Sequence, residues 1–238
     1  MPKNNEMTQE CESCVSLTKG IFCGLKEPEL VDVSKHKVSN HYKKGQTLFV
    51  QGNPPFGIYC VNKGNVKVTQ VAPDGKESIV RIATSGDVLG HRSLLTDQYY
   101  QATATALDDT NVCFIDKKYI LKLIQEQPSV ACNLIGKLGR DLGAAEHRIS
   151  SFYQKNVRER LAELLLLLKE SHGTPTENGI LLNIKLTREE MASIIGTASE
   201  TLIRFMSELK QEGLIRQDGK QLFVLNEQGL LDFAGTAY

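Results

Sequence analysis

Cysteines are the side chains near the start of this chain whose type and spacing could do chemistry. Cys11, Cys14 and Cys23 precede any recognisable element, and only two residues separate Cys11 from Cys14. A C-x-x-C spacing commonly begins a four-thiolate set, which holds an iron–sulfur cluster or a tetrahedral zinc ion. Cys11 and Cys14 could instead form a reversible dithiol. Cys60 and Cys132 lie in apolar contexts and are expected to be small core residues.

A second group of candidate side chains lies near the C-terminus, on a helix expected over residues 199–211. Its outward face is predicted to carry Ser199, Glu200, Ile203 and Arg204. Arg204 could donate two hydrogen bonds to a guanine edge, and Glu200 could accept one from cytosine. A solvated i,i+4 ion pair between Glu200 and Arg204 is the alternative.

The residues around this helix predict a winged helix. In LTREEMASIIGTASETLIRFMSELKQEGLIRQDGKQLFVLN (186–226), Thr187 and Glu190 form a T-x-x-E capping box that begins a first helix. Gly196 stands where a turn between two helices needs it, and the Asp-Gly pair at 218–219 indicates a β-hairpin. In such a motif the second helix enters the major groove and its N-terminal residues read bases. Phosphate contacts are expected from Lys185, Arg188, Arg216 and Lys220.

Residues 25–115 predict a β domain with turns rich in Gly and Asp. The strand-like runs are QTLFV (46–50), GIYCV (57–61), NVKVTQV (65–71), SIVRI (78–82), QATATAL (101–107) and NVCFI (111–115). Many short strands at regular spacing indicate a barrel or a roll. Near residue 117 the period of the apolar residues becomes helical.

A long helix is expected over about 129–154, between the two domains. Its apolar residues follow a heptad a/d spacing: Ile135, Leu138, Leu142, Ala145, Ile149 and Phe152. Charged residues flank this seam, which favours a homodimer coiled coil; packing of the helix on its own domain is the alternative. HGTPTENG (172–179) is expected to be a loop.

Composition limits the class of protein. Lys plus Arg equals Asp plus Glu, 28 each, so net charge alone does not point to a polyanion partner. The opening residues are polar, and the longest apolar run, 164–168, is far shorter than a membrane span. We expect a soluble cytoplasmic protein without a membrane partner. It is not expected to be an enzyme, because no nucleophile elbow, P-loop or H-E-x-x-H is present.

In combination these features resemble the Crp/Fnr family of transcription regulators. The resemblance is carried by KKGQTLFVQGNPPFGIYCVNKGNVKV (43–68) and TASETLIRFMSELKQEGLI (197–215), and it spans residues 11 to about 232. It implies an α+β fold: an antiparallel, jelly-roll-like β-roll of the cyclic-nucleotide-binding type, a long dimerisation helix and a winged helix-turn-helix. The expected parts are a cysteine-containing segment (1–24), the β-roll (25–126), the dimerisation helix (127–155) and the DNA-binding domain (156–238).

The resemblance also implies a homodimer that binds double-stranded DNA at a palindromic site. Its recognition helices would lie about 34 Å apart, and Glu200 and Arg204 would read a TGA-like half-site core. RNA polymerase is an expected partner. The expected DNA-binding residues are Ser199, Glu200, Ile203, Arg204, Thr187, Arg188, Thr197 and Thr201. A cyclic-nucleotide-binding signalling module is the alternative, and the winged helix counts against it.

The β-roll of this family often binds a cyclic nucleotide. The cAMP-binding members carry a Glu for the ribose and an Arg-Ser pair for the phosphate. In GDVLGHRSLLTDQYYQATATAL (86–107), His91 stands in place of that Glu, and Gln101-Ala102 in place of Arg-Ser, which argues against cAMP. Some other effector or an empty, structural roll remain as alternatives. The candidate effector residues are Gly90, His91, Arg92, Ser93, Gln101 and Ala102.

The oxygen-sensing Fnr branch of the family holds a [4Fe–4S] cluster with three N-terminal cysteines and one in the β-roll. The resemblance therefore assigns the cluster to Cys11, Cys14, Cys23 and Cys113. The gap between Cys14 and Cys23 is longer than in the known sensor of that branch, so this chain departs from the pattern at the third ligand. A tetrahedral zinc ion would use the same four residues.

Overall fold

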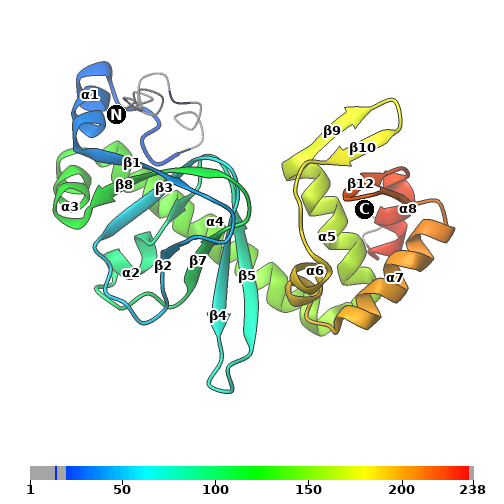
Figure 1. Ribbon diagram of the computed structural model, residues 1–238. Helices are drawn as coiled ribbons and strands as arrows, with labels where there is room; N and C mark the ends of the chain where they lie inside the picture. The colour runs from blue at the N-terminus through cyan, green and yellow to red at the C-terminus, as the bar shows by residue number, and fades with distance from the viewer. Residues whose placement is uncertain (1–13, 15–19, 236–238) are drawn as a thin grey trace, which may run out of the picture. The chain divides into compact units, whose positions relative to one another are not determined.

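The computed structural model describes residues 14 and 20–235, which belong to two compact units, Met1–Leu142 and Gly143–Tyr238 (Figure 1). The expected α+β fold, with its β-roll, long helix and winged helix, is confirmed. The first unit contains α1 (Glu27–His36), β1 (Lys37–Tyr42), β2 (Thr47–Phe49), β3 (Gly57–Lys63), β4 (Val66–Val71), β5 (Glu77–Ala83), β6 (Val88–Leu89), α2 (His91–Leu95), β7 (Thr103–Ala106), β8 (Thr110–Asp116), α3 (Lys117–Glu126) and the greater part of α4 (Pro128–Gln154).

Two antiparallel sheets form the β-roll. One has the strand order β1-β8-β3-β6 and the other β2-β7-β4-β5, with four strands in each. Alternate residues of both sheets point inward, as period-two sequences require, and form a shared apolar core. Its members are Leu48, Val61, Val66, Ala83, Leu89, Ala104, Ala106 and Val112.

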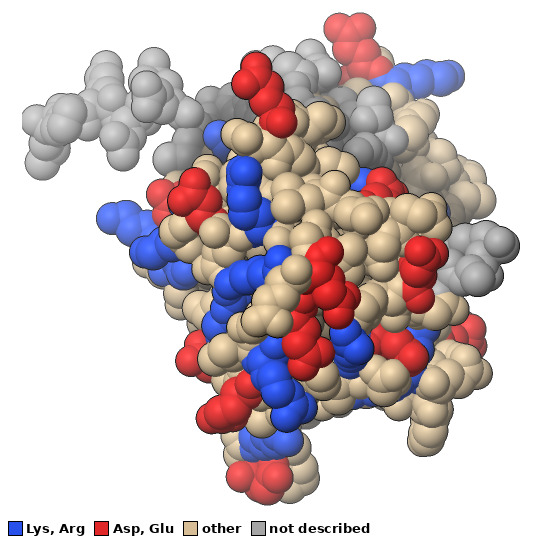
Figure 2. Space-filling model, turned by 90° about the vertical axis from the view of Figure 1, so that its right-hand side faces the viewer, with Lys and Arg blue, Asp and Glu red and all other residues tan. Residues whose placement is uncertain are grey.

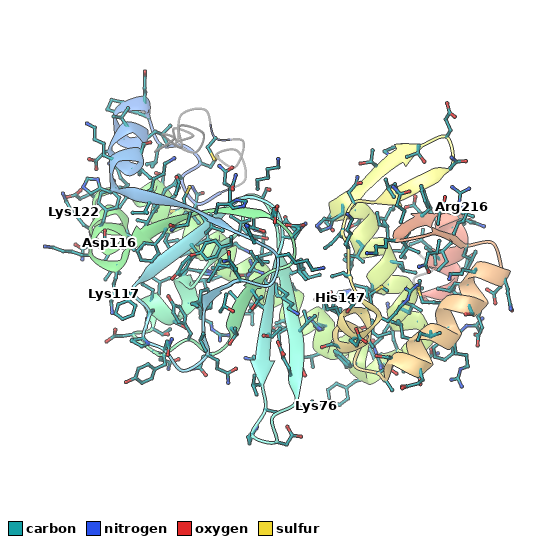
Figure 3. The ribbon with its side chains drawn as sticks, viewed as in Figure 1. Lys76, Asp116, Lys117, Lys122, His147 and Arg216 are labelled. Carbon is teal, nitrogen blue, oxygen red and sulfur yellow. The ribbon has the colours of Figure 1, made fainter. Side chains whose placement is uncertain are left out.

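The first sheet is also covered on its outer face. Ile58, Val88 and Ile115 of this sheet pack against a second apolar cluster that includes Val33 of α1 and Ile120 of α3. The first turns of α4 and the chain around residues 21–25 belong to the same cluster. Asp116, which Figure 3 labels, accepts a hydrogen bond from the backbone N of Tyr119 at 3.0 Å and so caps α3. Both faces of the first sheet are therefore covered. The Cys60 side chain packs against the apolar cluster on the outer face.

The second unit contains a helical pair and a small sheet. It consists of the last turns of α4, α5 (Val157–His172), β9 (Gly173–Thr176), β10 (Gly179–Leu182), α6 (Arg188–Ile195), α7 (Ser199–Gln211), β11 (Ile215–Asp218), β12 (Gln221–Val224) and α8 (Glu227–Phe233). The predicted capping box at Thr187 and Glu190 begins α6, and the predicted hairpin is β11–β12. Asn156 caps α5 by accepting from the backbone N of Arg158 and Glu159.

The prediction of a loop over residues 172–179 is wrong for most of its length. Residues 173–176 form β9, which pairs with β10, and β10 pairs in turn with β12. The wing is therefore part of a four-stranded sheet with the order β11-β12-β10-β9. Gly and Pro disfavour strands locally, but an edge strand pairs on one side only and tolerates Pro175.

The turn between α6 and α7 depends on Gly196 and on an aromatic ring from α4. Gly196 has φ = 67°, and a Cβ built on it would lie 2.5 Å from Cε1 of Phe152. The centroid of the Phe152 ring lies 5.9 Å from the guanidinium carbon of Arg148 and 4.8 Å from that of Arg160. Arg148 donates to the backbone O of Ile194 at 2.7 Å, at the C-terminal end of α6. The last turns of α4 thus support the turn of the helix pair.

No helix in the described part of the chain is both long enough and apolar enough to cross a membrane.

Gly196→Ala is expected to destabilise the second unit more than Gly213→Ala does. Both glycines have positive φ, 67° and 70°, so each alanine costs about 1–2 kcal/mol in backbone strain. At Gly196 the new methyl group would also displace the Phe152 ring, whereas nothing lies within 4 Å of a Cβ built at Gly213. Urea titrations would measure both changes in the free energy of unfolding. Equal losses would contradict a constraint from Phe152.

Candidate nucleic-acid interface

Helix α7 has one buried and one exposed face, as the sequence predicts. Leu202, Met206 and Leu209 are almost completely buried, whereas Glu200 and Arg204 are exposed. Ile203 is 50% exposed. The exposed face therefore offers a carboxylate, a guanidinium and an apolar side chain to a ligand.

Glu200 and Arg204 are not paired with each other. Both lie in the described part of the chain, and no ion pair joins them there. The Arg204 guanidinium instead lies 4.9 Å from the centroid of the half-buried Phe205 ring. The alternative of a solvated i,i+4 ion pair is thus not the arrangement in this structure, and both charged groups keep their hydrogen-bonding capacity for a ligand.

The N-terminus of α7 is left without a side-chain cap. Its N-cap residue is Ala198, which makes no capping hydrogen bond. Helix α6, in contrast, has a complete capping box at its N-terminus. Glu190 N donates to Thr187 Oγ1 at 3.1 Å, and Thr187 N donates to Glu190 Oε2 at 2.9 Å. The first N–H groups of α7 can therefore donate to an anion such as a phosphate.

Gln217 of β11 gathers two basic side chains beside the helix pair. Its Oε1 accepts hydrogen bonds from Arg188 Nη2 and, at 2.9 Å, from Lys210 Nζ. Burial, and then the charge of Arg188, lower the pKa of Lys210. Lys210 and Gln217 were not expected as functional residues, because a bridge between a helix and the wing leaves no local signal in the sequence.

The remaining predicted DNA-binding residues lie on the same unit. Lys185 and Lys220 are exposed, Thr197 and Thr201 are half-buried, and Arg216, labelled in Figure 3, lies 4.7 Å from the Phe223 ring on the wing. The face of the molecule seen in Figure 2 carries Lys and Arg interspersed with Asp and Glu. Attraction to a polyanion would therefore come from local groupings such as Arg188 and Lys210 and not from a uniformly basic surface.

The predicted effector residues lie on and next to α2 and just before β7. Gly90 adopts φ = 80° at the start of α2, Arg92 is exposed, and Ser93 is buried with its hydroxyl donating to the backbone O of Tyr99 at 3.2 Å. Gln101 donates to the same carbonyl oxygen at 3.1 Å, and Ala102 is half-buried. Stacked rings occupy space inside the roll, with those of Phe49 and Tyr100 4.1 Å apart.

His91 belongs to a network of charges that joins the β-roll to α4. Asp141 Oδ2 of α4 lies 3.4 Å from His91 Nε2 and accepts from Arg81 Nη1 of β5 at 2.9 Å. Asp141 Oδ1 accepts from Lys137 Nζ at 2.5 Å. Arg81 and Lys137 also reach Asp87 Oδ1, at 3.1 and 3.0 Å. His91 Nδ1 is buried and has no hydrogen-bond partner among the described residues.

The environment of Asp141 keeps its carboxylate charged. Burial alone would raise the pKa of Asp141, but hydrogen bonds from His91 and Lys137 and the charge of Arg81 hold that pKa far below its usual value. The Asp141 carboxylate of α4 therefore meets the Arg81 guanidinium of the roll in a partly buried ion pair. His91, predicted from the resemblance to face an effector, faces this carboxylate.

Three cysteines line one pocket on the outer face of the first sheet. Cys14, Cys60 and Cys113 are among its lining residues, and we call it the thiol pocket. Cys23 is exposed and lines a neighbouring hollow, while Cys11 lies outside the described residues. Within residues 14 and 20–235, no group of three or more His, Cys, Asp or Glu is arranged to hold a metal ion.

Two domain families match this chain. A model of the cyclic nucleotide-binding domain matches residues 39–127, which correspond to the β-roll. A model of the Crp-like helix-turn-helix domain matches residues 159–233, which include the helix pair and the wing. The order of the two matches is the order of the two units described above.

Relatives of known description match along most of the chain. The CRP-like cAMP-activated global transcriptional regulator of Mycobacterium tuberculosis is 26% identical over 211 residues, which cover 89% of this chain and 94% of the relative. The transcriptional activator protein FnrL of Cereibacter sphaeroides is 28% identical over 235 residues, covering 94% and 92%. The solved structure of FixK2 from Bradyrhizobium japonicum is similar in fold, with a TM-score of 0.76 and 23% identity over 85% of this chain and 99% of that one.

Asp141→Asn is expected to destabilise the first unit by about 1–2 kcal/mol at pH 7, because Arg81 and Lys137 lose charge-assisted hydrogen bonds. The pKa of Asp141 is lowered on folding, so its contribution is complete above the unfolded pKa of about 3.9 and is lost as the pH falls below it. The difference between wild type and variant, measured by urea titration from about pH 5 downward, should shrink below about pH 4.

The exposed Asp109 provides the control for this measurement, because it takes no part in the network. Asp109→Asn should change the free energy of unfolding little at any of these pH values. A loss in Asp141→Asn that stays constant down to about pH 3 would contradict the role of the charged carboxylate.

Proposed function

Because this chain is a DNA-binding transcription regulator of the Crp/Fnr type, we propose that it binds a palindromic DNA site as a homodimer under the control of oxygen or redox state. The outer face of α7 carries the proposal. Glu200 and Arg204 project from it without pairing with each other, next to helix N–H groups that lack a cap. RNA polymerase is the proposed partner of the DNA-bound dimer.

Reading of the DNA is assigned to the first turns of α7. Arg204 donates two hydrogen bonds to a guanine, and Glu200 accepts one from a cytosine, which together suit a TGA-like half-site core. Arg188 and Lys210, held together by Gln217, contact phosphates and fix the register of the helix. Thr187, Thr197 and Thr201 are the proposed sources of further hydroxyl contacts.

The dimer is proposed to form along α4. Three seam residues expose large fractions of their side chains: Ile135 68%, Leu142 60% and Ile149 57%. We call these three the α4 stripe. They follow one another at seven-residue spacing, which a second copy of the helix covers in a coiled coil. Leu138 is half-buried and Ala145 is exposed, so both can contribute to the seam, whereas Phe152 packs on Gly196 of its own chain.

The signal is proposed to be received by a cluster held by cysteine thiolates. Cys14 and Cys113 line one pocket, which fits a ligand pair from the N-terminal segment and the β-roll. Cys14 and Cys113 would be two of the thiolates that hold such a cluster. When bound, such a cluster supplies sensitivity to oxygen. Protein prepared without oxygen should contain iron and acid-labile sulfide, and chemical analysis of both would test this proposal.

Transmission to the dimer is proposed to run through Asn133 of α4. Its Nδ2 donates to the backbone O of Ile21 at 3.1 Å and to that of Cys23 at 2.7 Å. Asn133 lies two residues before Ile135 of the α4 stripe. A change in the cysteine-containing segment therefore acts directly on the helix that positions the two recognition helices.

Arg204→Ala is expected to weaken binding to a duplex with inverted TGA half-sites by about 1–3 kcal/mol per half-site, because a bidentate base contact is lost. Binding to a random duplex of equal length should change little. Fluorescence anisotropy at one fixed salt concentration would measure both affinities, with protein prepared without oxygen and with air-exposed protein.

Arg188→Ala is the matched control, since Arg188 is assigned to a phosphate. It should weaken binding to both duplexes by a similar factor and lower the salt dependence by about one ion per protomer. Equal weakening on both duplexes by Arg204→Ala would remove the base-reading role from Arg204. Absence of any preference for the palindrome in both preparations would overturn the proposed site.

Leu142→Glu is expected to convert the dimer to monomers, because it places a charge in an apolar seam without a partner. Leu167 of α5 is the control: it is similarly exposed, at 57%, but lies outside the α4 stripe. Light scattering at micromolar concentration should find Leu167→Glu dimeric and Leu142→Glu monomeric. A dimeric Leu142→Glu protein would argue against α4 as the interface.

A further inference from the structure

Cys60 and Cys113 stand directly opposite each other on the two central strands of the first sheet. The strand register pairs Cys60 of β3 with Cys113 of β8, and both residues line the thiol pocket. Opposite residues of antiparallel strands point to the same face of the sheet. The two thiols are therefore immediate neighbours on well-defined strands, although they lie far apart in the sequence.

The backbone hydrogen bonds of β3 define which kind of cross-strand pair the two cysteines form. Val61 N donates to Asp87 O at 2.9 Å, and Val61 O accepts from Gly86 N at 2.8 Å, so the Val61 backbone faces the β6 side. The direction alternates along a strand, so Cys60 faces β8 and forms a hydrogen-bonded pair with Cys113. The Cα atoms of such a pair are about 5.5 Å apart, and disulfides span Cα separations of about 4.4–6.8 Å.

A disulfide across this pair would be easy to reduce. Cβ atoms of opposite residues are about 4.5–5.5 Å apart, which is more than the roughly 3.5–4.5 Å found in most disulfides. Closing the bond therefore requires a small additional twist of β3 against β8. Because such a distortion stores strain and makes a disulfide more reducible, the pair suits a reversible modification better than a permanent cross-link.

The surroundings of the pair favour attack by a thiolate on a small oxidant. The thiol pocket has a volume of about 40 Å³, and a cavity of about 10–15 Å³ already holds a water molecule. The Ser39 hydroxyl lies 3.8 Å from Cys113 Sγ, within reach of a hydrogen bond to sulfur. Lys37 of the same strand lines the pocket, and a nearby positive charge favours the thiolate, which is the reactive form.

We propose that Cys60 and Cys113 form a reversible cross-strand disulfide on reaction with a hydroperoxide. One thiolate attacks a peroxide oxygen, the O–O bond breaks, and the leaving oxygen takes a proton, which gives a sulfenic acid. The second thiol attacks that sulfur and displaces water. In total, two thiols and one hydroperoxide give one disulfide, one alcohol or water, and one water. The two sulfur atoms lose the two electrons that the peroxide gains, and a dithiol reverses the modification by exchange.

The disulfide also bears on the cluster proposed above. Cys113 is assigned to that cluster as a thiolate, and a sulfur atom within a disulfide is no longer a thiolate. Protein with the Cys60–Cys113 bond should therefore be unable to ligate iron through Cys113 until the bond is reduced. Only this consequence rests on the proposed function, because the disulfide itself forms in protein without iron.

The test uses the full chain, prepared without iron and treated with an equimolar amount of hydrogen peroxide. The remaining thiols are alkylated with iodoacetamide, and the protein is digested with trypsin without a reductant. Cleavage after Lys and Arg places Cys60 in the peptide 45–63 and Cys113 in the peptide 93–117. Mass spectrometry should find these two peptides joined and lighter by two hydrogen atoms than their sum. Dithiothreitol should restore the separate peptides.

Two variants control for the other thiols. Cys132→Ser should leave the yield of the joined peptides unchanged, because Cys132 is exposed on α4 and outside the thiol pocket. Cys14→Ser should also keep that yield, although Cys14 lines the same pocket. A wild-type product that joins Cys14 to Cys60 or to Cys113 in place of the expected pair would overturn the assignment. So would separate, alkylated peptides in protein whose other thiols the peroxide has oxidised.

Iron uptake separates this inference from the proposed function. After peroxide treatment and removal of the excess, the protein is supplied with ferrous iron and sulfide without oxygen, with and without prior dithiothreitol. Uptake only after dithiothreitol supports both the disulfide and its effect on the cluster. Joined peptides in a protein that never takes up iron overturn the cluster and leave the disulfide standing. Iron uptake by protein that yields no joined peptides overturns the disulfide and leaves the cluster standing.

Discussion

The charge network on Asp141 is the interaction on which the functional faces of this protein depend. Asp141 accepts from Arg81 of β5, and Lys137 and the buried Leu134 lie one and two turns before it on α4. Successive residues of a helix are rotated by about 100°, so fixing this face against the roll decides which residues point outward. Ile135 and Leu142 point outward for that reason, and the dimer proposal depends on their exposure.

The last turns of α4 have a different task, and they lie in the other unit. Arg148 donates to a carbonyl at the C-terminal end of α6, where a cation also interacts favourably with the helix dipole. Phe152 fills the space above Gly196, which has no side chain. One helix therefore carries an ionic attachment to the roll, an exposed apolar stripe, and an aromatic contact with the turn before the recognition helix.

Local patterns in the sequence were sufficient to predict several of these features. The period of α4, the capping box of Thr187 and Glu190, and the Asp-Gly hairpin are each set by residues a few positions apart. Strand β9 could not be predicted in this way, because Gly173–Thr176 becomes a strand only by pairing with β10. Tertiary contacts override local propensity in such cases.

The candidate sites also divide into those that local sequence patterns predict and those that only tertiary contacts create. The exposed face of α7 follows from helical period alone, and Glu200 and Arg204 were found by it. The neighbourhood of Cys60 and Cys113 follows from the register of β3 and β8, which no short-range pattern encodes. Gln217 was missed for a related reason, since its bridge between Arg188 and Lys210 joins the wing to both helices.

The free energy that attaches residues 21–23 to the first unit is comparable to the free energy that shifts a two-state equilibrium. Burial of Ile21 and Phe22 stabilises the segment by about 1.5–3 kcal/mol each, and the two hydrogen bonds from Asn133 add about 0.5–1.5 kcal/mol each. Fixing a backbone costs about 1–2 kcal/mol per residue, so for a segment of a few residues the gains and costs are similar. Moving a two-state equilibrium from 1:99 to 99:1 needs about 5.5 kcal/mol. In the proposed function, ligation of the Cys14 thiolate would decide whether the segment holds Asn133, and with it the helix that carries the α4 stripe.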